Sequence, residues 1–203
     1  MEDIVKKETL TIEHYDNNAD AFWQGTKDHD VTQNIDAFLD ALPKGRALNI
    51  LDFGCGPGRD LQYFKSLGHN PVGLDGSKQF CDMAQQYSSC PTLHQNFSDL
   101  DLSTYQFDGV FANASLFHVP KIKLPNVLKT IHSSLPHNGV LFMSNPRGTG
   151  EQWQGQRYGH YMELEACQAF LEQAGFNVLQ HYYRPEGQPR NKQHWLAIVC
   201  QRG

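Results

Sequence analysis

The sequence predicts an α/β fold, in which a doubly wound, seven-stranded and mostly parallel sheet carries helices on both faces and ends in a C-terminal antiparallel hairpin. Three observations carry this prediction. Short apolar runs alternate with stretches of helical period, and the first of these runs leads directly into a glycine-rich turn. The last two β-rich runs, 178–184 and 193–200, are joined by a connection too short for a crossover helix, so they must pair antiparallel.

Length and composition predict one folded unit. A chain of 203 residues can bury one full core, and its 39% hydrophobic and 19% charged residues are ordinary for a globular protein. Apolar residues recur at helical spacing between Val31 and Leu42 before Pro43 and Gly45 end the helix. We therefore expect a single domain over residues 1–203, with an N-terminal helical cap over 1–45 and the α/β core over 46–203.

Charge and hydropathy argue against several classes of partner. A net charge of −5 is a poor match for a nucleic-acid phosphate backbone, although a local basic patch can coexist with it. Strongly apolar runs are only a few residues long, which argues against a membrane span. The first residues, Met1, Glu2 and Asp3, also lack the basic and apolar regions of a signal peptide. We expect a cytoplasmic protein.

The five cysteines indicate neither a disulfide framework nor a metal site. Their number is odd, and no CxxC pair or other ligand-like spacing occurs. We expect reduced, mostly buried thiols, and we predict no metal site.

The glycine-rich turn is the first candidate for a binding site. The apolar run 47–53 resembles a buried parallel strand, and Gly54, Gly56 and Gly58 follow it at alternate positions. Glycine adopts positive φ without strain and lets the backbone approach a ligand closely. Taken alone, this pattern is equally typical of a structural turn.

A second signal lies where a nucleoside would need it. The next apolar run ends in Asp75, 21 residues after Gly54, which is the spacing at which a carboxylate reaches ribose hydroxyls. Arg59 stands where a dinucleotide-binding motif has its third glycine, and Asp52 at the mouth of the turn would repel phosphates. The same acid would attract the sulfonium and ammonium groups of S-adenosylmethionine, so we favour that cofactor.

These residues resemble a known family. LDFGCGPG at 51–58 and VGLDGS at 72–77 are similar to the first two motifs of class I S-adenosylmethionine-dependent methyltransferases. The resemblance implies a Rossmann-like core, S-adenosyl-L-methionine as cofactor and S-adenosyl-L-homocysteine as product. The cofactor-binding residues expected in the two motifs are Asp52, Gly54, Gly56, Gly58, Asp75 and Gly76.

The elements that follow agree with this resemblance. Helices are expected from 59 to Gly68 and from Ser77, a plausible N-cap, and a third strand over 92–96. Family members commonly place an acid at the end of that strand to meet the adenine amino group, beside an apolar side chain. Here Asn96 and Phe97 stand there, and the Asn96 amide oxygen can accept the same hydrogen bond. A plain strand-end turn is the alternative.

Four further residues outside the two motifs have candidate roles. The fourth strand, over 107–112, leads to Asn113, which the resemblance places near the methionine part of the cofactor. His118 either holds this loop by a hydrogen bond or acts as a general base, a role for which His160 is the other candidate. Tyr15 belongs to a YDxxA segment that often closes over the cofactor in this family, or it fastens the N-terminal helix to the body.

The segment 145–161 is the candidate acceptor site. It follows the fifth strand, over 140–143, and we expect an irregular loop because its residues show no periodicity. Arg147, Trp153, Arg157 and Tyr158 in this segment suit a small anionic or aromatic molecule. Alternatively, they satisfy loop carbonyls and cover the edge of the sheet.

The leading hypothesis is an S-adenosylmethionine-dependent methyltransferase that acts on a small molecule by in-line displacement. The alternatives are a methyltransferase acting on nucleic acid or protein, and a non-catalytic relative that binds the cofactor. A nicotinamide oxidoreductase is less favoured, because 203 residues leave no room for a separate substrate domain.

Overall fold

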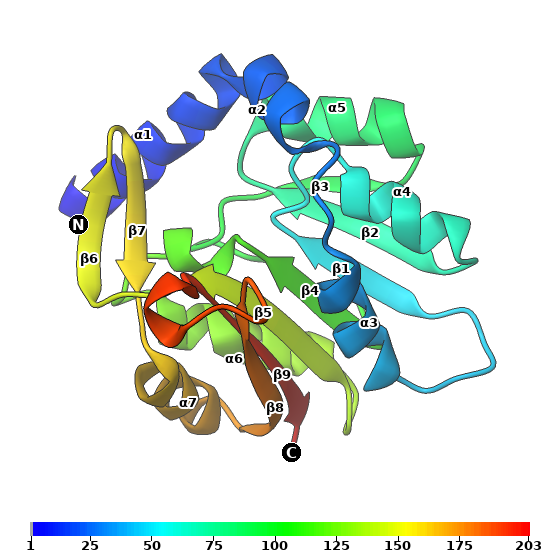
Figure 1. Ribbon diagram of the computed structural model, residues 1–203. Coiled ribbons are helices and arrows are strands. Elements are labelled where there is room, and N and C mark those ends of the chain that lie inside the picture. Colours follow the sequence, from blue (N-terminus) through cyan, green and yellow to red (C-terminus); the bar gives the residue numbers. More distant parts are fainter. Residues whose placement is uncertain (1) are drawn as a thin grey trace.

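The computed structural model describes residues 2–203, and its centre is a seven-stranded sheet with the order β3-β2-β1-β4-β5-β9-β8 (Figure 1). Strands β1 to β5 are parallel, whereas β9 runs antiparallel to both β5 and β8. The mostly parallel sheet with a C-terminal hairpin is therefore confirmed. The strands of this sheet are β1 (Asn49–Phe53), β2 (Asn70–Asp75), β3 (Thr92–His94), β4 (Gly109–Asn113), β5 (Val140–Pro146), β8 (Phe176–Arg184) and β9 (Trp195–Arg202).

Helices cover both faces of the sheet. Helices α3 and α4 contribute to the core cluster on one face, and α6 and α7 to the cluster on the other. Ser77 caps α5 as expected, since its hydroxyl accepts a hydrogen bond from the Phe80 N–H. The helices are α1 (Glu2–Asn17), α2 (Ala19–Thr26), α3 (Thr32–Asp40), α4 (Arg59–Ser66), α5 (Lys78–Ser88), α6 (Leu124–Ser134) and α7 (Leu164–Gln173), with short 3-10 turns at Leu116–His118 and Arg190–Lys192.

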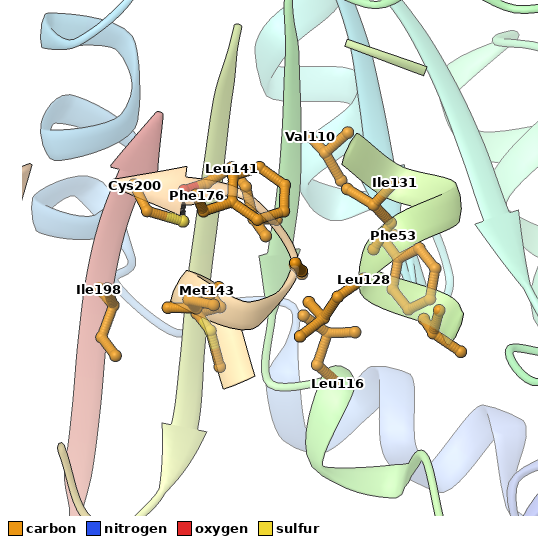
Figure 2. Close-up of a cluster of buried hydrophobic side chains, with 14 of the residues drawn as sticks. Phe53, Val110, Leu116, Leu128, Ile131, Leu141, Met143, Phe176, Ile198 and Cys200 are labelled. Carbon is orange, nitrogen blue, oxygen red and sulfur yellow. Dashed lines mark hydrogen bonds between the residues drawn. The ribbon is translucent and has the colours of Figure 1, made fainter. Parts of the chain in front are cut away.

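Alternating side chains of the central strands build the two core clusters. In β1, Leu51 and Phe53 point toward α6, whereas Ile50 points toward α3 and α4. Figure 2 shows the first cluster, where Leu128 and Ile131 of α6 lie over the central strands. All five cysteines are buried as free thiols, as the sequence predicts.

The segment 145–161 differs from the expected irregular loop. Strand β5 continues to Pro146, and β6 (Gly150–Gln154) and β7 (Arg157–Tyr161) then form a two-stranded antiparallel hairpin. The residues of β6 are all exposed, so this hairpin has no apolar alternation of the kind that reveals a strand. Its signal was instead the two-residue turn at 155–156, flanked by residues with high β-propensity.

The topology brings the carboxyl ends of the parallel strands, helix α1 and strand β7 to one edge of the sheet. The chain order reverses between β1 and β4, and ligands bind at the carboxyl ends of parallel strands at such a switch point. Helix α1 lies beside β7 near this edge (Figure 1). Within residues 2–203, no helix has the length and apolar character that a bilayer crossing requires.

Candidate functional site

The glycine turn after β1 is held against the sheet by backbone hydrogen bonds. The N–H groups of Gly54 and Cys55 both donate to the Leu74 carbonyl, at 2.7 and 3.1 Å. A Cβ on Gly54 would lie 2.3 Å from the Ser115 Cβ, and φ at Gly54 is +78°. Gly56 has φ of +51°, and a Cβ there would meet only Phe22, at 3.6 Å. The turn therefore needs glycine at 54 for packing, while the backbone at 56 borders open space.

Asp75 faces this turn. Its Oδ2 accepts the Gly56 N–H at 3.0 Å and its Oδ1 accepts the Ser77 N–H at 2.9 Å. Burial raises the pKa of this carboxyl to about 6, although the two N–H groups oppose the shift. Asp75 is only 8% exposed and takes part in none of the ion pairs found among residues 2–203. Since a carboxylate has about four acceptor positions, two remain for hydroxyl donors.

Two of the residues expected at the cofactor do not line the cavity. Asp52 is 2% exposed and lies behind the turn, where burial and then the charge of Asp60 raise its pKa well above its usual range. Its Oδ2 is a buried atom that has no hydrogen-bond partner. Gly58 points toward α5, because a Cβ there would lie 2.8 Å from the Cα of Ala84. The acid at the mouth of the turn is instead Asp60, paired with Arg59 at 2.7 Å.

A cavity of about 700 Å³ opens over the carboxyl ends of the strands. Its walls come from α1, the α2–α3 connection, the glycine turn, the ends of β2 to β5, Arg157 of the hairpin and the C-terminal strands. The sequence-predicted residues that line it are Tyr15, Gly54, Gly56, Asp75, Gly76, Asn96, Phe97, Asn113, His118 and Arg157.

The end of the cavity beyond β3 has unpaired acceptors. Asn96 accepts the Ser98 N–H through Oδ1 at 3.0 Å and donates through Nδ2 to the Glu8 Oε2 at 3.3 Å. The Glu8 Oε1 and the Ser98 Oγ are buried and have no partner. Glu8 comes from α1, so sequence reasoning about the strand end could not associate it with Asn96. A ring with an amino group would satisfy these acceptors.

Tyr15 and His118 form a hydrogen-bonded pair at the cavity wall. The His118 Nδ1 lies 2.6 Å from the Tyr158 carbonyl, which can only accept, so Nδ1 carries the proton. The Nε2 therefore accepts from the Tyr15 hydroxyl at 2.8 Å. Burial lowers the pKa of His118 to about 4, and Arg157 contributes in the same direction. The imidazole is neutral in this arrangement.

Helix α1 is fastened across the site by side-chain contacts. The Asp16 Oδ1 accepts the Ser77 hydroxyl at 2.6 Å and the Gln79 N–H at 3.1 Å. At the other side, the Thr11 Oγ1 accepts the Tyr158 N–H at 3.0 Å. Tyr15 therefore lies in a helix that is fastened to the body, and its side chain lines the cavity.

Asn113 is fixed by a neighbouring helix. Its Oδ1 accepts from the Asn34 Nδ2 of α3 at 2.9 Å, and Tyr182 in turn donates to the Asn34 Oδ1 at 2.9 Å. The next residue, Ala114, has a positive φ of 62°, which turns the chain out of β4 along the cavity wall. The Asn113 side chain thus serves the packing of α3, and its backbone borders the cavity.

Of the four residues predicted at the acceptor, only Arg157 lines the cavity. Arg147 pairs with Glu163 at 2.9 Å and donates to the carbonyls of Arg190 and Gln193. Trp153 is 44% exposed, and the Tyr158 hydroxyl donates to Glu151 at 2.5 Å. These three stabilise the hairpin and its surroundings. Lining residues that the sequence did not reveal include Glu8, Phe22, Phe80 and Trp195.

Comparison with known proteins finds a matching family model and several curated relatives. A family model described as a methyltransferase domain matches residues 23–181. The chain is 30% identical over 149 residues to an uncharacterized protein of Haemophilus influenzae, which covers 62% of this chain and 58% of the relative. It is 26% identical over 110 residues to malonyl-(acyl-carrier protein) O-methyltransferase of Enterobacter lignolyticus, covering 54% and 43%. The chain thus spans about half the length of these curated relatives.

A solved structure shares the fold over nearly the whole chain. The 1,6-didemethyltoxoflavin-N1-methyltransferase of Burkholderia thailandensis, crystallised with 1,6-didemethyltoxoflavin and S-adenosylhomocysteine, superposes with a TM-score of 0.76. The match covers 96% of this chain and 88% of the other at 20% identity. At that identity the likeness establishes the fold alone.

Proposed function

Because this chain belongs to the methyltransferase domain family, we propose that it transfers a methyl group from S-adenosylmethionine to a small-molecule acceptor. The observation that carries the proposal is the Asp75 carboxylate, which faces the glycine turn inside a large cavity and has no basic partner among the ion pairs of residues 2–203. The crystallised Burkholderia relative, with its bound S-adenosylhomocysteine, supports the same cofactor.

The residues around the cavity fit this donor. Asp75 would accept the two ribose hydroxyls, and the unpaired oxygens of Glu8 and Ser98 would meet the adenine amino group beside Phe97. The open backbone at Gly56 would border the amino-acid part. When bound, S-adenosylmethionine supplies an electrophilic methyl group on a positively charged sulfur.

The protein's task in this reaction is alignment. An electron pair of the acceptor atom forms the new bond to carbon, and the pair of the breaking carbon–sulfur bond stays on sulfur. Holding the two partners in line and excluding water lowers the barrier without a nucleophilic residue or a metal. Helix α1, which Thr11 joins to the β6–β7 hairpin, lines the cavity and serves both purposes.

The Tyr15 and His118 pair suits a role in orienting the methyl acceptor better than a role as a general base. The Tyr15 hydroxyl borders the cavity and is held by the His118 Nε2, so its oxygen presents lone pairs to an acceptor. Since the pKa of His118 is about 4, an imidazolium formed there at neutral pH would be short-lived. This suits an acceptor that is already deprotonated or that loses its proton to water after transfer.

The shape of the cavity favours a small acceptor over a macromolecule. Its volume of about 700 Å³ lies within the range of small-molecule sites, which is roughly 300–1,000 Å³. Helix α1 is fastened at both ends of the cavity by Asp16 and Thr11, so a nucleic acid or a folded protein could not enter without displacing it.

Calorimetry with S-adenosylhomocysteine, followed by a methyl-transfer assay over acceptor classes, tests the proposal. Asp75→Ala should weaken S-adenosylhomocysteine binding by about 1–3 kcal/mol, because two ribose hydroxyls lose their acceptor. Asp82→Ala removes a carboxylate that pairs with Lys78 on the surface of α5, and it should leave the affinity unchanged. Wild-type protein that does not bind S-adenosylhomocysteine would refute the proposed function.

A further inference from the structure

Arg157 is a cation at the cavity wall that lacks a carboxylate partner. None of the ion pairs among residues 2–203 includes it, and its polar partners are uncharged: NH2 donates to the Gln154 Oε1 at 3.4 Å, and the guanidinium also interacts with the Tyr15 phenol. Its Nε is buried and has no partner. Leaving a buried donor of a charged group unpaired is costly, and an anion bound in the cavity would remove that cost.

The other arginines of the cavity wall have polar partners. Arg59 pairs with Asp60 at 2.7 Å. Arg184 donates to the Asp30 carbonyl at 3.1 Å, and its charge helps to lower the pKa of the Asp30 carboxyl after the hydrogen bonds from Thr32. No lysine lines the cavity. Among the described arginines of the cavity wall, Arg157 is the one with a buried guanidinium nitrogen that has no partner.

The groups around Arg157 are uncharged and largely aromatic. Its charge acts on the phenols of Tyr15 and Tyr161 and on the neutral imidazole of His118. Phe117 lines the same wall and packs against the ring of His118, with ring centroids 4.0 Å apart. A ligand group that pairs with Arg157 would thus have an aromatic surface beside it.

We propose that Arg157 binds a carboxylate carried by the methyl acceptor, whose remaining part is apolar or aromatic. This inference rests on the proposed function. The planar guanidinium matches the two oxygens of a carboxylate. A single unpaired guanidinium balances a monovalent anion, which favours a carboxylate over a doubly charged phosphate. The contact lies beside Tyr15 and His118, so it would fix the acceptor next to the pair that orients it.

The test uses matched acids and amides on protein saturated with S-adenosylhomocysteine. Acetate, benzoate and phenylacetate are titrated by calorimetry at pH 7.5 against acetamide, benzamide and phenylacetamide. At least one acid should bind wild-type protein tenfold or more tightly than its amide. Arg157→Gln should reduce that preference to less than twofold and leave S-adenosylhomocysteine affinity unchanged, which also shows that the variant is folded.

Arg147→Gln is the matched control. It removes the same charge from the same segment, but its guanidinium pairs with Glu163 and does not line the cavity. The acid preference should therefore remain within twofold of wild type.

Four results would overturn the inference. A tenfold loss of S-adenosylhomocysteine affinity in Arg157→Gln would assign this arginine to the donor's own carboxylate. An equal affinity for every acid and its amide in wild-type protein would show that no anion site exists. Tighter binding of phenyl phosphate than of benzoate would exclude a carboxylate site. If wild-type protein bound no S-adenosylhomocysteine at all, the proposed function would fail together with this inference, whereas the other results leave that function standing.

Discussion

The two halves of the cavity are built in different ways. The half below the glycine turn consists of strand ends, and backbone hydrogen bonds from Gly54 and Cys55 to Leu74 hold it to the sheet. The half around Arg157 comes from α1 and the β6–β7 hairpin, which lie outside the seven-stranded sheet. Side-chain contacts hold α1 to the hairpin, such as the Thr11 hydroxyl that accepts the Tyr158 N–H, and the Tyr15–His118 contact holds α1 to the turn after β4.

This difference separates a fixed region from an adaptable one. A turn whose backbone is bonded to a buried strand cannot move without breaking the sheet, so its geometry suits a ligand that does not vary. The hairpin can change its residues or its position at the cost of a few side-chain contacts, which suits a variable partner. We therefore propose that the donor lies mainly in the first half, where Glu8 of α1 also reaches its adenine end, and that the acceptor lies in the second.

Gly54→Ala should give the largest effect, because it acts on the fixed half. The added Cβ would lie 2.3 Å from the Ser115 Cβ at a residue with φ of +78°. Left-handed strain of about 1–2 kcal/mol and overpacking of about 1–3 kcal/mol together predict a loss of roughly 2–5 kcal/mol in the free energy of unfolding. Urea denaturation measures this loss, and calorimetry should show that S-adenosylhomocysteine binding is lost.

Gly45→Ala is the control for backbone strain alone. Gly45 has φ of +83° but no neighbouring atom within 4 Å of the added Cβ. It should cost about 1–2 kcal/mol and leave ligand affinity unchanged. If both variants lost equal stability, the contact between the turn and Ser115 would not be what fixes this half.

The fixed half could be predicted from the sequence because its geometry is local. A strand, a glycine turn and an acid at the end of the next strand determine one another's positions, and the structure places Gly54, Gly56 and Asp75 along the cavity. Asp52 does not lie at the mouth of the turn as the sequence predicts, because adjacent strand residues point to opposite faces. Its side chain leaves on the face of Ile50, toward the helices rather than the mouth of the turn.

The other half could not be resolved in this way because its contacts join distant segments. Arg147 and Arg157 have the same type and a similar position in the sequence, yet Arg147 is neutralised by Glu163 and Arg157 is not. Glu8 reaches Asn96 across 88 residues of chain. Only the tertiary packing of α1 and the hairpin decides which side chains meet the cavity.

Donor affinity in the fixed half should depend on pH, with an effect of intermediate size. Asp75 has a pKa of about 6, so it is protonated below that pH and then accepts fewer hydrogen bonds from ribose hydroxyls. Affinity for S-adenosylhomocysteine should rise with pH through 6 and level off above 7, by roughly tenfold between pH 5 and 7.5. Calorimetry across this range measures it.

The stability of the donor-free protein should change in the opposite direction. Because the folded-state pKa of Asp75 is raised, the folded protein binds more protons than the unfolded chain between about pH 4 and 6, and stability falls as pH rises through this window. Asp75→Asn should flatten both dependences. Affinity that is independent of pH in wild-type protein would contradict the ribose assignment.

Thr11→Val tests the adaptable half, and its effect should remain local to the contact between α1 and the hairpin. The Thr11 Oγ1 accepts the Tyr158 N–H and joins α1 to the hairpin, and valine keeps the shape while removing the acceptor. Leaving this buried N–H unpaired should cost about 1–3 kcal/mol locally. Thr130→Val, on the exposed side of α6, loses only a bond to the Asn126 carbonyl and is the matched control.

Hydrogen exchange at the Tyr158 amide should accelerate in Thr11→Val alone, while the amide of Gly54, bonded to Leu74, keeps its protection. Equal acceleration at both amides would mean that the two halves open together, and the division between a fixed and an adaptable region would then be wrong.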